Sequence, residues 1–172
     1  SATGPHTICV RPQARIMALK GLGDEGWGYT TWLAAAVRYA ADNGAHVISN
    51  SWGGYGTSRL LNATFEYARS RGVVCLAAAG NNDQDARTST PAHIHGVITV
   101  AATTENDQKT SFSNYGDVVA ISAPGGGTGW IGANILSTLP DNCRILQERP
   151  DLRVSPGYGR LRGTSMAYPH AA

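Results

Sequence analysis

The alternation of short apolar runs with helix-like segments is the feature that most constrains how this chain can fold. Two segments carry apolar residues at helical spacing: residues 29–43, and a second helix that Thr57 or Ser58 could cap. Strand, helix, strand, helix, strand is the order typical of a parallel sheet with crossover helices. The predicted strands are residues 14–20, 47–49 and 73–79.

Glycines and further apolar runs extend the same pattern along the chain. Gly44 and Gly72 follow the predicted helices, where a left-handed residue commonly ends a helix. Further strands are predicted at residues 97–102 and 118–122. The polar segment 140–156 has a proline at both ends and is interpreted as an excursion between strands within one domain.

Three loops are expected to form the ligand-binding edge of this sheet. Ligands of open α/β sheets bind beyond the carboxyl ends of the strands. The loops predicted there are rich in Gly, Asn and Ser, which suits close approach of the backbone to a ligand. They are residues 21–28, 50–57 and 80–87.

Composition excludes several classes of protein. Hydrophobic residues make up 42% of the 172 residues, enough for a packed core. The net charge is +2 without any block of Lys or Arg, so nothing indicates binding to nucleic acid or to an anionic membrane. The sequence contains no apolar run near the ~20 residues of a membrane-spanning helix.

Three cysteines cannot all pair within one chain. Cys75 lies in an apolar run and is interpreted as a small buried residue. A disulfide between Cys9 and Cys143 stays open as an alternative. The absence of Cys-x-x-Cys argues against a zinc site, and no metal-binding residue is predicted.

The strongest chemical signal is the octapeptide Gly-Thr-Ser-Met-Ala-Tyr-Pro-His at residues 163–170. Gly163 allows a sharp turn that places Ser165 at the start of a helix, where free N–H groups favour negative charge. A hydroxyl in that position can attack a carbonyl, and the N–H of Ser165 can stabilise the resulting oxyanion. An ordinary N-cap is the alternative interpretation of an isolated Gly-Thr-Ser.

Two weaker signals support the first. Asn81 follows a strand that ends in small residues, so its amide could donate to an oxyanion, although Gly-Asn-Asn is also common in turns. The strand that ends at Ser51, Trp52, Gly53 and Gly54 could offer free main-chain groups to an extended peptide.

Taken together, these three segments resemble the subtilisin-like serine proteases, or subtilases. The octapeptide resembles the serine motif of that family, residues 77–81 its oxyanion segment, and residues 51–54 its substrate-binding strand. The resemblance continues through Ser-Phe-Ser-Asn-Tyr-Gly at residues 111–116 and Ala-Pro-Gly at residues 123–125. It covers most of the chain and implies an α/β fold: a three-layer sandwich with a mainly parallel sheet flanked by helices.

The resemblance also implies a role for each matching residue. Ser165 would be the acyl-forming nucleophile, and Asn81 would share the oxyanion with the Ser165 N–H. Trp52 and Trp27 would flank the channel for substrate residues upstream of the cut; the alternative is that both pack locally and leave selectivity broad. Small walls at Ala78, Ala79 and Gly80, with no carboxylate in residues 77–82, predict cleavage after large apolar or aromatic residues. The implied substrate-binding residues are Ser51, Trp52, Gly53, Gly26, Trp27, Gly28, Ala78, Ala79 and Gly80.

The sequence departs from the family pattern in one large respect. The catalytic aspartate and the His-Gly-Thr-His motif should precede residue 14, and neither is present. The chain is therefore expected to be a partial catalytic domain, lacking these elements and the C-terminal end, and to be inactive alone. A structural role is the favoured interpretation of every other candidate: Asp24, His6, His46, His93, His95 and His170.

Two other functions fit the sequence less well. A subtilase-fold pseudo-protease would bind peptides without cleaving them, but the presence of Ser165 and Asn81 argues against a loss of catalytic residues. An esterase of the α/β-hydrolase type would need Gly-x-Ser-x-Gly, whereas Met-Ala follows Ser165. The resemblance implies a polypeptide substrate, no cofactor in this chain, a secreted or extracytoplasmic location, and calcium as an open question for a longer parent.

Overall fold

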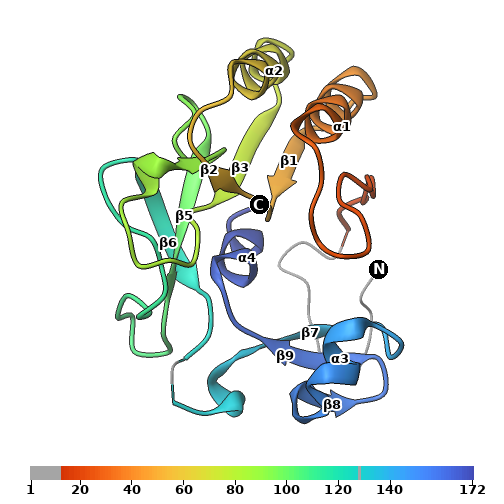
Figure 1. Ribbon diagram of the computed structural model, residues 1–172, viewed down its shortest axis with the longest axis vertical. Coiled ribbons are helices and arrows are strands. Elements are labelled where there is room, and N and C mark those ends of the chain that lie inside the picture. Colours follow the sequence, from red (N-terminus) through yellow and green to blue (C-terminus); the bar gives the residue numbers. More distant parts are fainter. Residues whose placement is uncertain (1–12, 128) are drawn as a thin grey trace.

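A parallel sheet of four strands forms the centre of the computed structural model, which describes residues 13–127 and 129–172. The strand order is β1-β3-β5-β6, and all three neighbouring pairs are parallel (Figure 1). The order confirms the predicted α/β class, and the strands lie within a residue or two of the predicted ranges. Their bounds are β1 Val47–Asn50, β3 Val74–Ala78, β5 Ile98–Thr103 and β6 Val119–Pro124.

Two helices, α1 (Thr30–Asp42) and α2 (Arg59–Ser70), pack on one face of the sheet. Their apolar stripes bury against Ile48, Cys75 and Ala77, and Phe65 of α2 is fully buried in this core. Ser58 caps α2 by accepting a hydrogen bond from the Leu61 N–H at 3.3 Å. Such a cap stabilises a helix by about 1 kcal/mol.

Gly44 and Gly72 follow the two helices with φ values of 82° and 81°, as their positions in the sequence predicted. A residue with a Cβ adopts this left-handed conformation only at a cost, so glycine suits both helix ends.

The opposite face of the sheet is covered by the end of the chain. Alternate residues of β3 point to opposite faces, so Leu76 packs away from α1 and α2, against Ala167 and Tyr168. These two residues belong to α4 (Thr164–Ala167) and to the 3-10 helix η4 (Tyr168–His170). The α-helix predicted at the end of the chain therefore has one α-helical turn before a 3-10 turn. The molecule thus has three layers (Figure 1).

Two smaller sheets flank the central one. The strands β2 (Gly54–Tyr55) and β4 (Ser89–Thr90) pair antiparallel beside the carboxyl ends of β1 and β3. Below the central sheet in Figure 1, three strands are ordered β7-β9-β8. Their bounds are β7 Ile135–Thr138, β8 Arg153–Ser155 and β9 Tyr158–Leu161.

Four short helices complete the described structure. The segment 140–156 lies between β7 and β9 and contains α3, η3 and β8, so it is an excursion between strands, as predicted. The helices are η1 Ala86–Thr88, η2 Ile131–Ala133, α3 Arg144–Glu148 and η3 Pro150–Leu152.

One strand prediction is wrong. Residues 14–20 form no strand, and their side chains are exposed, with Ile16 at 82%. A strand forms only where a neighbour supplies hydrogen bonds, and no described strand pairs with this segment. The apolar composition of residues 14–20 suits a strand, but composition alone does not supply a neighbouring strand to pair with.

Cys75 is a buried free thiol, as predicted. Burial raises its pKa to about 11, so the reactive thiolate is scarce near neutral pH. Cys143 is also free, and Cys9, its candidate partner, lies outside the described residues.

Candidate active site

Ser165 lies in the first turn of α4, directly after a sharp bend in the backbone. Gly163 makes this bend with φ 147° and ψ 164°, a conformation that side chains with a Cβ rarely adopt. The Gly163 N–H donates to the carbonyl oxygen of Gly125 at 2.8 Å, and this fixes the bend against the end of β6. A Cβ on Gly125 would lie 2.4 Å from the Cβ of Ala102, so glycine is required for this close approach.

Asn81 lies beside Ser165 although 84 positions separate them in the sequence. Its Oδ1 accepts hydrogen bonds from the Thr164 N–H at 2.8 Å and from the Thr164 hydroxyl at 2.9 Å. A backbone N–H can only donate, so this contact determines which side of the amide is oxygen. The Nδ2 group is left without a partner among the described residues and is available to an incoming ligand.

The Ser165 hydroxyl donates to the carbonyl oxygen of Ser51 at 3.2 Å. Ser51 directly follows β1, so this contact joins the end of β1 to the start of α4, and the contacts of Asn81 with Thr164 join the loop after β3 to the same place. Such convergence at the carboxyl ends of parallel strands is the expected place for a ligand site. The three segments singled out in the sequence therefore meet at one point.

Two adjoining cavities open at this point. The first has a volume of about 200 Å³ and includes Ser165 and Asn81 in its lining. The second has a volume of about 310 Å³ and lies between the loops that contain Trp27 and Trp52. Both are lined by Ser51, Trp52 and Gly53, so this segment separates one cavity from the other. Neither lining contains a charged side chain.

Most of the predicted substrate-binding residues line these cavities. Ala78 and Gly80 line the first cavity, and Gly26, Trp27 and Gly28 line the second. Ala79 is the exception: it lines neither cavity, is fully buried, and packs in a small cluster with Ala86 and Ala101.

Two residues of the first cavity, Ser89 and Thr90, lie outside every segment that the sequence singled out, whereas Tyr55 and Asn82 lie in the predicted loops 50–57 and 80–87. Tyr55, Ser89 and Thr90 reach it through the pairing of β2 with β4, and Asn82 follows Asn81 directly. This pairing joins segments about 35 positions apart, and no local sequence pattern predicts it.

No described histidine or carboxylate contacts Ser165. His46 precedes β1 and so lies at the opposite end of that strand from Ser51. His93 Nδ1 is 2.9 Å from the carbonyl oxygen of Ser89, and His170 Nδ1 is 3.2 Å from that of Ala167.

The remaining candidates are also accounted for. The carbonyl oxygen of His95 accepts a hydrogen bond from Arg69 at 2.8 Å. Asp24 forms an exposed ion pair with Lys20, whose hydrogen bond holds the pKa of the Asp24 carboxyl below its usual value. His6 lies outside the described residues.

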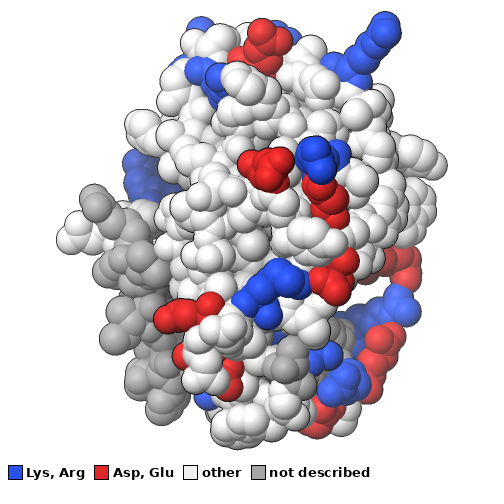
Figure 2. Space-filling model, turned by 90° about the vertical axis from the view of Figure 1, so that its left-hand side faces the viewer, with Lys and Arg blue, Asp and Glu red and all other residues white. Residues whose placement is uncertain are grey.

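Charges on the described surface are mixed in sign. On the face shown in Figure 2, basic and acidic side chains lie next to one another. Ion pairs among the described residues include Lys109 with Asp83 at 2.6 Å and Arg87 with Asp85 at 2.5 Å. Exposed pairs of this kind contribute little to stability.

Comparison with known proteins gives a consistent result. Residues 2–172 match the sequence model of the Subtilase family. Thermitase of Thermoactinomyces vulgaris is 41% identical over 161 residues, which is 94% of this chain and 50% of thermitase. Fervidolysin of Fervidobacterium pennivorans is 36% identical over 180 residues, or 97% of this chain and 25% of fervidolysin.

Solved structures show the same similarity. A protease from Pseudoalteromonas arctica PAMC 21717 superposes with a TM-score of 0.82 at 31% identity, covering 95% of this chain and 50% of its own. A cold-adapted subtilisin-like serine proteinase superposes with a TM-score of 0.70 at 34% identity, and the match covers 87% of this chain and 47% of that proteinase. This chain thus spans half or less of each of these proteins.

Proposed function

This chain belongs to the subtilase family, and from that membership we propose that its parent protein is a serine endopeptidase. One observation carries the proposal: Ser165 and the free amide Nδ2 of Asn81 meet at the lining of one cavity. A nucleophile next to an unpaired amide donor is the arrangement that acyl transfer needs.

The proposed reaction proceeds through an acyl-enzyme at Ser165. Its Oγ attacks the carbonyl carbon of the substrate, and the Oγ proton passes to a general base. The oxyanion that forms accepts hydrogen bonds from the Ser165 N–H and from Asn81 Nδ2. The base returns its proton to the leaving amine, and water then hydrolyses the ester to release the acid and regenerate Ser165.

We assign the base and the group that orients it to a His and an Asp of the parent protein outside these 172 residues. Two observations support this assignment. No described histidine or carboxylate contacts Ser165, and its hydroxyl donates to the carbonyl oxygen of Ser51 instead. In a functional triad, this hydroxyl must donate to the base.

An extended substrate would add a strand between two segments of this chain. The loops containing Ser51, Trp52 and Gly53 and containing Gly26, Trp27 and Gly28 face the second cavity together, so they are the proposed flanking segments. Ala78 and Gly80 would form part of the wall that receives the side chain next to the cleaved bond.

A fluorophosphonate probe tests the proposed chemistry. We expect the full-length parent to be labelled at Ser165, because a general base makes this hydroxyl nucleophilic. The isolated 172-residue chain should remain unlabelled, since its hydroxyl stays protonated at neutral pH. Peptide mass spectrometry locates the modified serine.

Either of two outcomes would contradict this prediction. Stoichiometric labelling of the isolated chain would show that it contains its own base. A folded parent protein that binds peptides but takes up no probe would support a subtilase-fold pseudo-protease.

The specificity prediction rests on the two tryptophans. Trp52 lines both cavities and Trp27, 58% exposed, lines the second. Burying a substrate side chain against an indole contributes about 1–3 kcal/mol. With no charge in either lining, we expect cleavage after large apolar or aromatic residues. Trp52→Leu should reduce selectivity at upstream substrate positions by about tenfold.

A peptide library profiled on the full-length wild type and on Trp52→Leu measures this effect. Trp130→Leu, an exposed tryptophan that lines neither cavity, is the matched control and should leave the profile unchanged. Identical profiles for wild type and Trp52→Leu, or dominant cleavage after Lys or Arg, would contradict the prediction.

The remaining parts of the proposal concern the setting of the parent protein. A polypeptide substrate and a secreted or extracytoplasmic location follow from family membership alone. No helix in the described part of the chain is long and apolar enough to cross a membrane. Among the described residues, no group of three or more His, Cys, Asp or Glu side chains is placed to hold a metal ion.

A further inference from the structure

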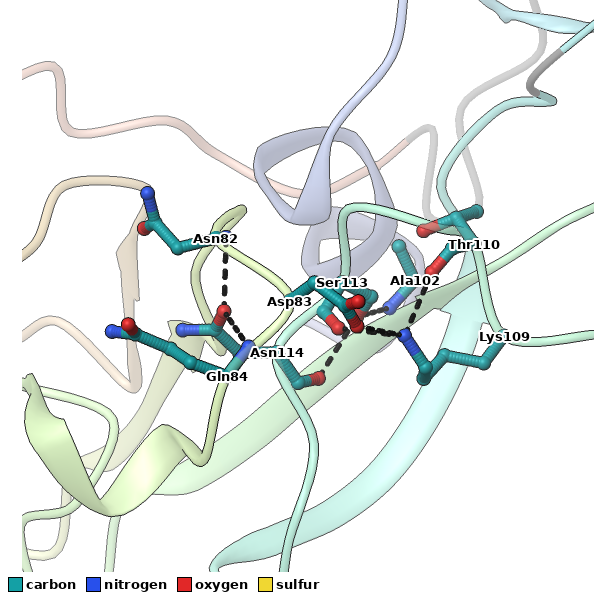
Figure 3. Close-up of polar contacts among 8 residues, drawn as sticks. All are labelled: Asn82, Asp83, Gln84, Ala102, Lys109, Thr110, Ser113 and Asn114. Carbon is teal, nitrogen blue, oxygen red and sulfur yellow. Dashed lines mark hydrogen bonds and ion pairs between the residues drawn. The ribbon is translucent and has the colours of Figure 1, made fainter.

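Asn114 is a fully buried residue whose side chain uses all of its hydrogen-bonding capacity on the loop that carries Asn81 and on its surroundings. Its Oδ1 accepts from the backbone N–H of Asn82 at 2.9 Å and of Gln84 at 3.2 Å (Figure 3). Its Nδ2 donates to the carbonyl oxygen of Ala79 at 2.9 Å and to the hydroxyl of Ser89 at 3.1 Å. These partners surround Asn81 on both sides in the sequence.

Backbone contacts reinforce the same junction. The Asn114 N–H donates to the carbonyl oxygen of Gly80 at 2.9 Å, and the Asp83 N–H donates to that of Phe112 at 2.9 Å. Gly80 has a φ of 108°, and a Cβ there would lie 2.4 Å from Asn114 Nδ2. The absence of a side chain at Gly80 therefore permits the close approach of Asn114 to the loop.

The segment that carries Asn114 is itself fixed to the central sheet. Ser113 is fully buried; its hydroxyl accepts from the Ala102 N–H at 2.9 Å and donates to the Asn114 carbonyl oxygen at 3.0 Å. The ammonium of Lys109 lies 2.6 Å from Asp83 Oδ1, and it links the two loops a second time (Figure 3). A continuous series of hydrogen bonds thus runs from β5 through Asn114 to the Asn81 loop.

We propose that Asn114 is a positioning residue that holds Asn81 where its Nδ2 can meet the oxyanion. The inference rests on the proposed function, because it assigns Asn114 a role only in that reaction. An oxyanion donor acts over a narrow distance, about 2.7–3.1 Å. Displacing a catalytic group by about 1 Å can cost about 10²-fold in rate.

Removing the Asn114 side chain would take a hydrogen-bond partner from two N–H groups, one carbonyl oxygen and the Ser89 hydroxyl. The loop at residues 79–84 would then be free to relax and to carry Asn81 with it. Contacts between Asn81 and Thr164 would persist, so the loss should be smaller than the loss caused by removing Asn81 itself.

The test measures kcat and KM of the full-length parent with Asn114→Ala, Asn81→Ala and both changes. We expect Asn114→Ala to lower kcat by about 10- to 100-fold with less than about a threefold change in KM. In the Asn81→Ala background, Asn114→Ala should lower kcat by less than about threefold, because the side chain that Asn114 would position is already absent.

Two control variants separate positioning from general loss of stability. Gln84→Ala keeps the backbone N–H that Asn114 binds and removes only a side-chain contact with Thr88, so its kinetics should match wild type. Val37→Ala weakens the core under α1, far along the chain from this loop, and should lower the melting temperature without lowering kcat.

A second measurement does not depend on catalysis. Hydrogen exchange at the amides of Asn82 and Gln84 should accelerate by at least about tenfold in Asn114→Ala, because both lose their acceptor. Should that variant fail to fold, Asn114→Asp keeps an acceptor oxygen while removing the donor. It is expected to retain protection of these two amides and to show a smaller fall in kcat.

The outcomes distinguish the inference from the proposed function. The positioning role would be overturned if the parent is active and the fold-changes in kcat caused by Asn114→Ala and Asn81→Ala multiply in the double variant. Unchanged hydrogen exchange at the amides of residues 82 and 84 in Asn114→Ala would also overturn it. A folded parent that cleaves no peptide would overturn the proposed function, and the role of Asn114 with it.

Discussion

Replacing Ser165 with alanine in the full-length parent is expected to reduce kcat for peptide cleavage by about 10⁶-fold, the magnitude known for loss of the nucleophile in subtilisin. The physical reason is that alanine leaves no atom able to form the acyl-enzyme, while the cavity and Asn81 Nδ2 remain in place. Residual cleavage would come from oxyanion stabilisation and binding alone.

Steady-state kinetics on one chromogenic peptide, with matched protein concentrations, measure the effect. Ser70→Ala is the control, because this exposed serine at the end of α2 lines neither cavity and its hydroxyl donates to the carbonyl oxygen of Tyr67. KM and the melting temperature should change little in either variant. Retention of more than about a hundredth of wild-type kcat by Ser165→Ala would rule out Ser165 as the nucleophile.

Replacing Asn81 with alanine should lower kcat by about 10²–10³-fold while KM changes little, a range likewise known for subtilisin. The oxyanion is fully formed only beyond the ground state, so its donor stabilises the transition state more than the bound substrate. The structure supplies the geometric reason: Thr164 occupies Oδ1 and leaves Nδ2 available.

The kinetic constants of Asn81→Ala separate three roles. A fall in kcat alone identifies an oxyanion donor, whereas a rise in KM alone would make Asn81 a substrate-binding residue. Kinetics equal to wild type would remove Asn81 from the active site. Asn62→Ala, at an exposed position of α2, is the matched control and should leave both constants unchanged.

Features that depend on neighbouring residues along the chain could be predicted from the sequence. The helix α2 has its apolar face, its cap at Ser58 and its terminal Gly72 within 15 consecutive residues, and each was found where the pattern placed it. The short motifs around Ser165 and Asn81 were equally local, so both residues could be named as candidates.

Contacts between distant segments required the structure. Ala78 and Ala79 have the same side chain in the same run, yet one lines the cavity and the other is buried with Ala86. Ala78 is the last residue of β3 and Ala79 follows it, so their successive side chains point in opposite directions, as they do along a strand. Asn114 appeared in the sequence only as part of a motif, and its contacts with the Asn81 loop span about 30 positions.

The sequence by itself therefore determined the α/β class, the order of the two long helices and the four central strands, the family, and the choice of Ser165 and Asn81 as candidate site residues. The tertiary structure alone decided that residues 14–20 form no strand, that β2 pairs with β4, and that Asn81 offers Nδ2 rather than Oδ1 to the cavity. The reason is that side-chain periodicity and backbone conformation are local properties of the chain. A hydrogen bond between remote segments exists only where the fold brings a donor to an acceptor.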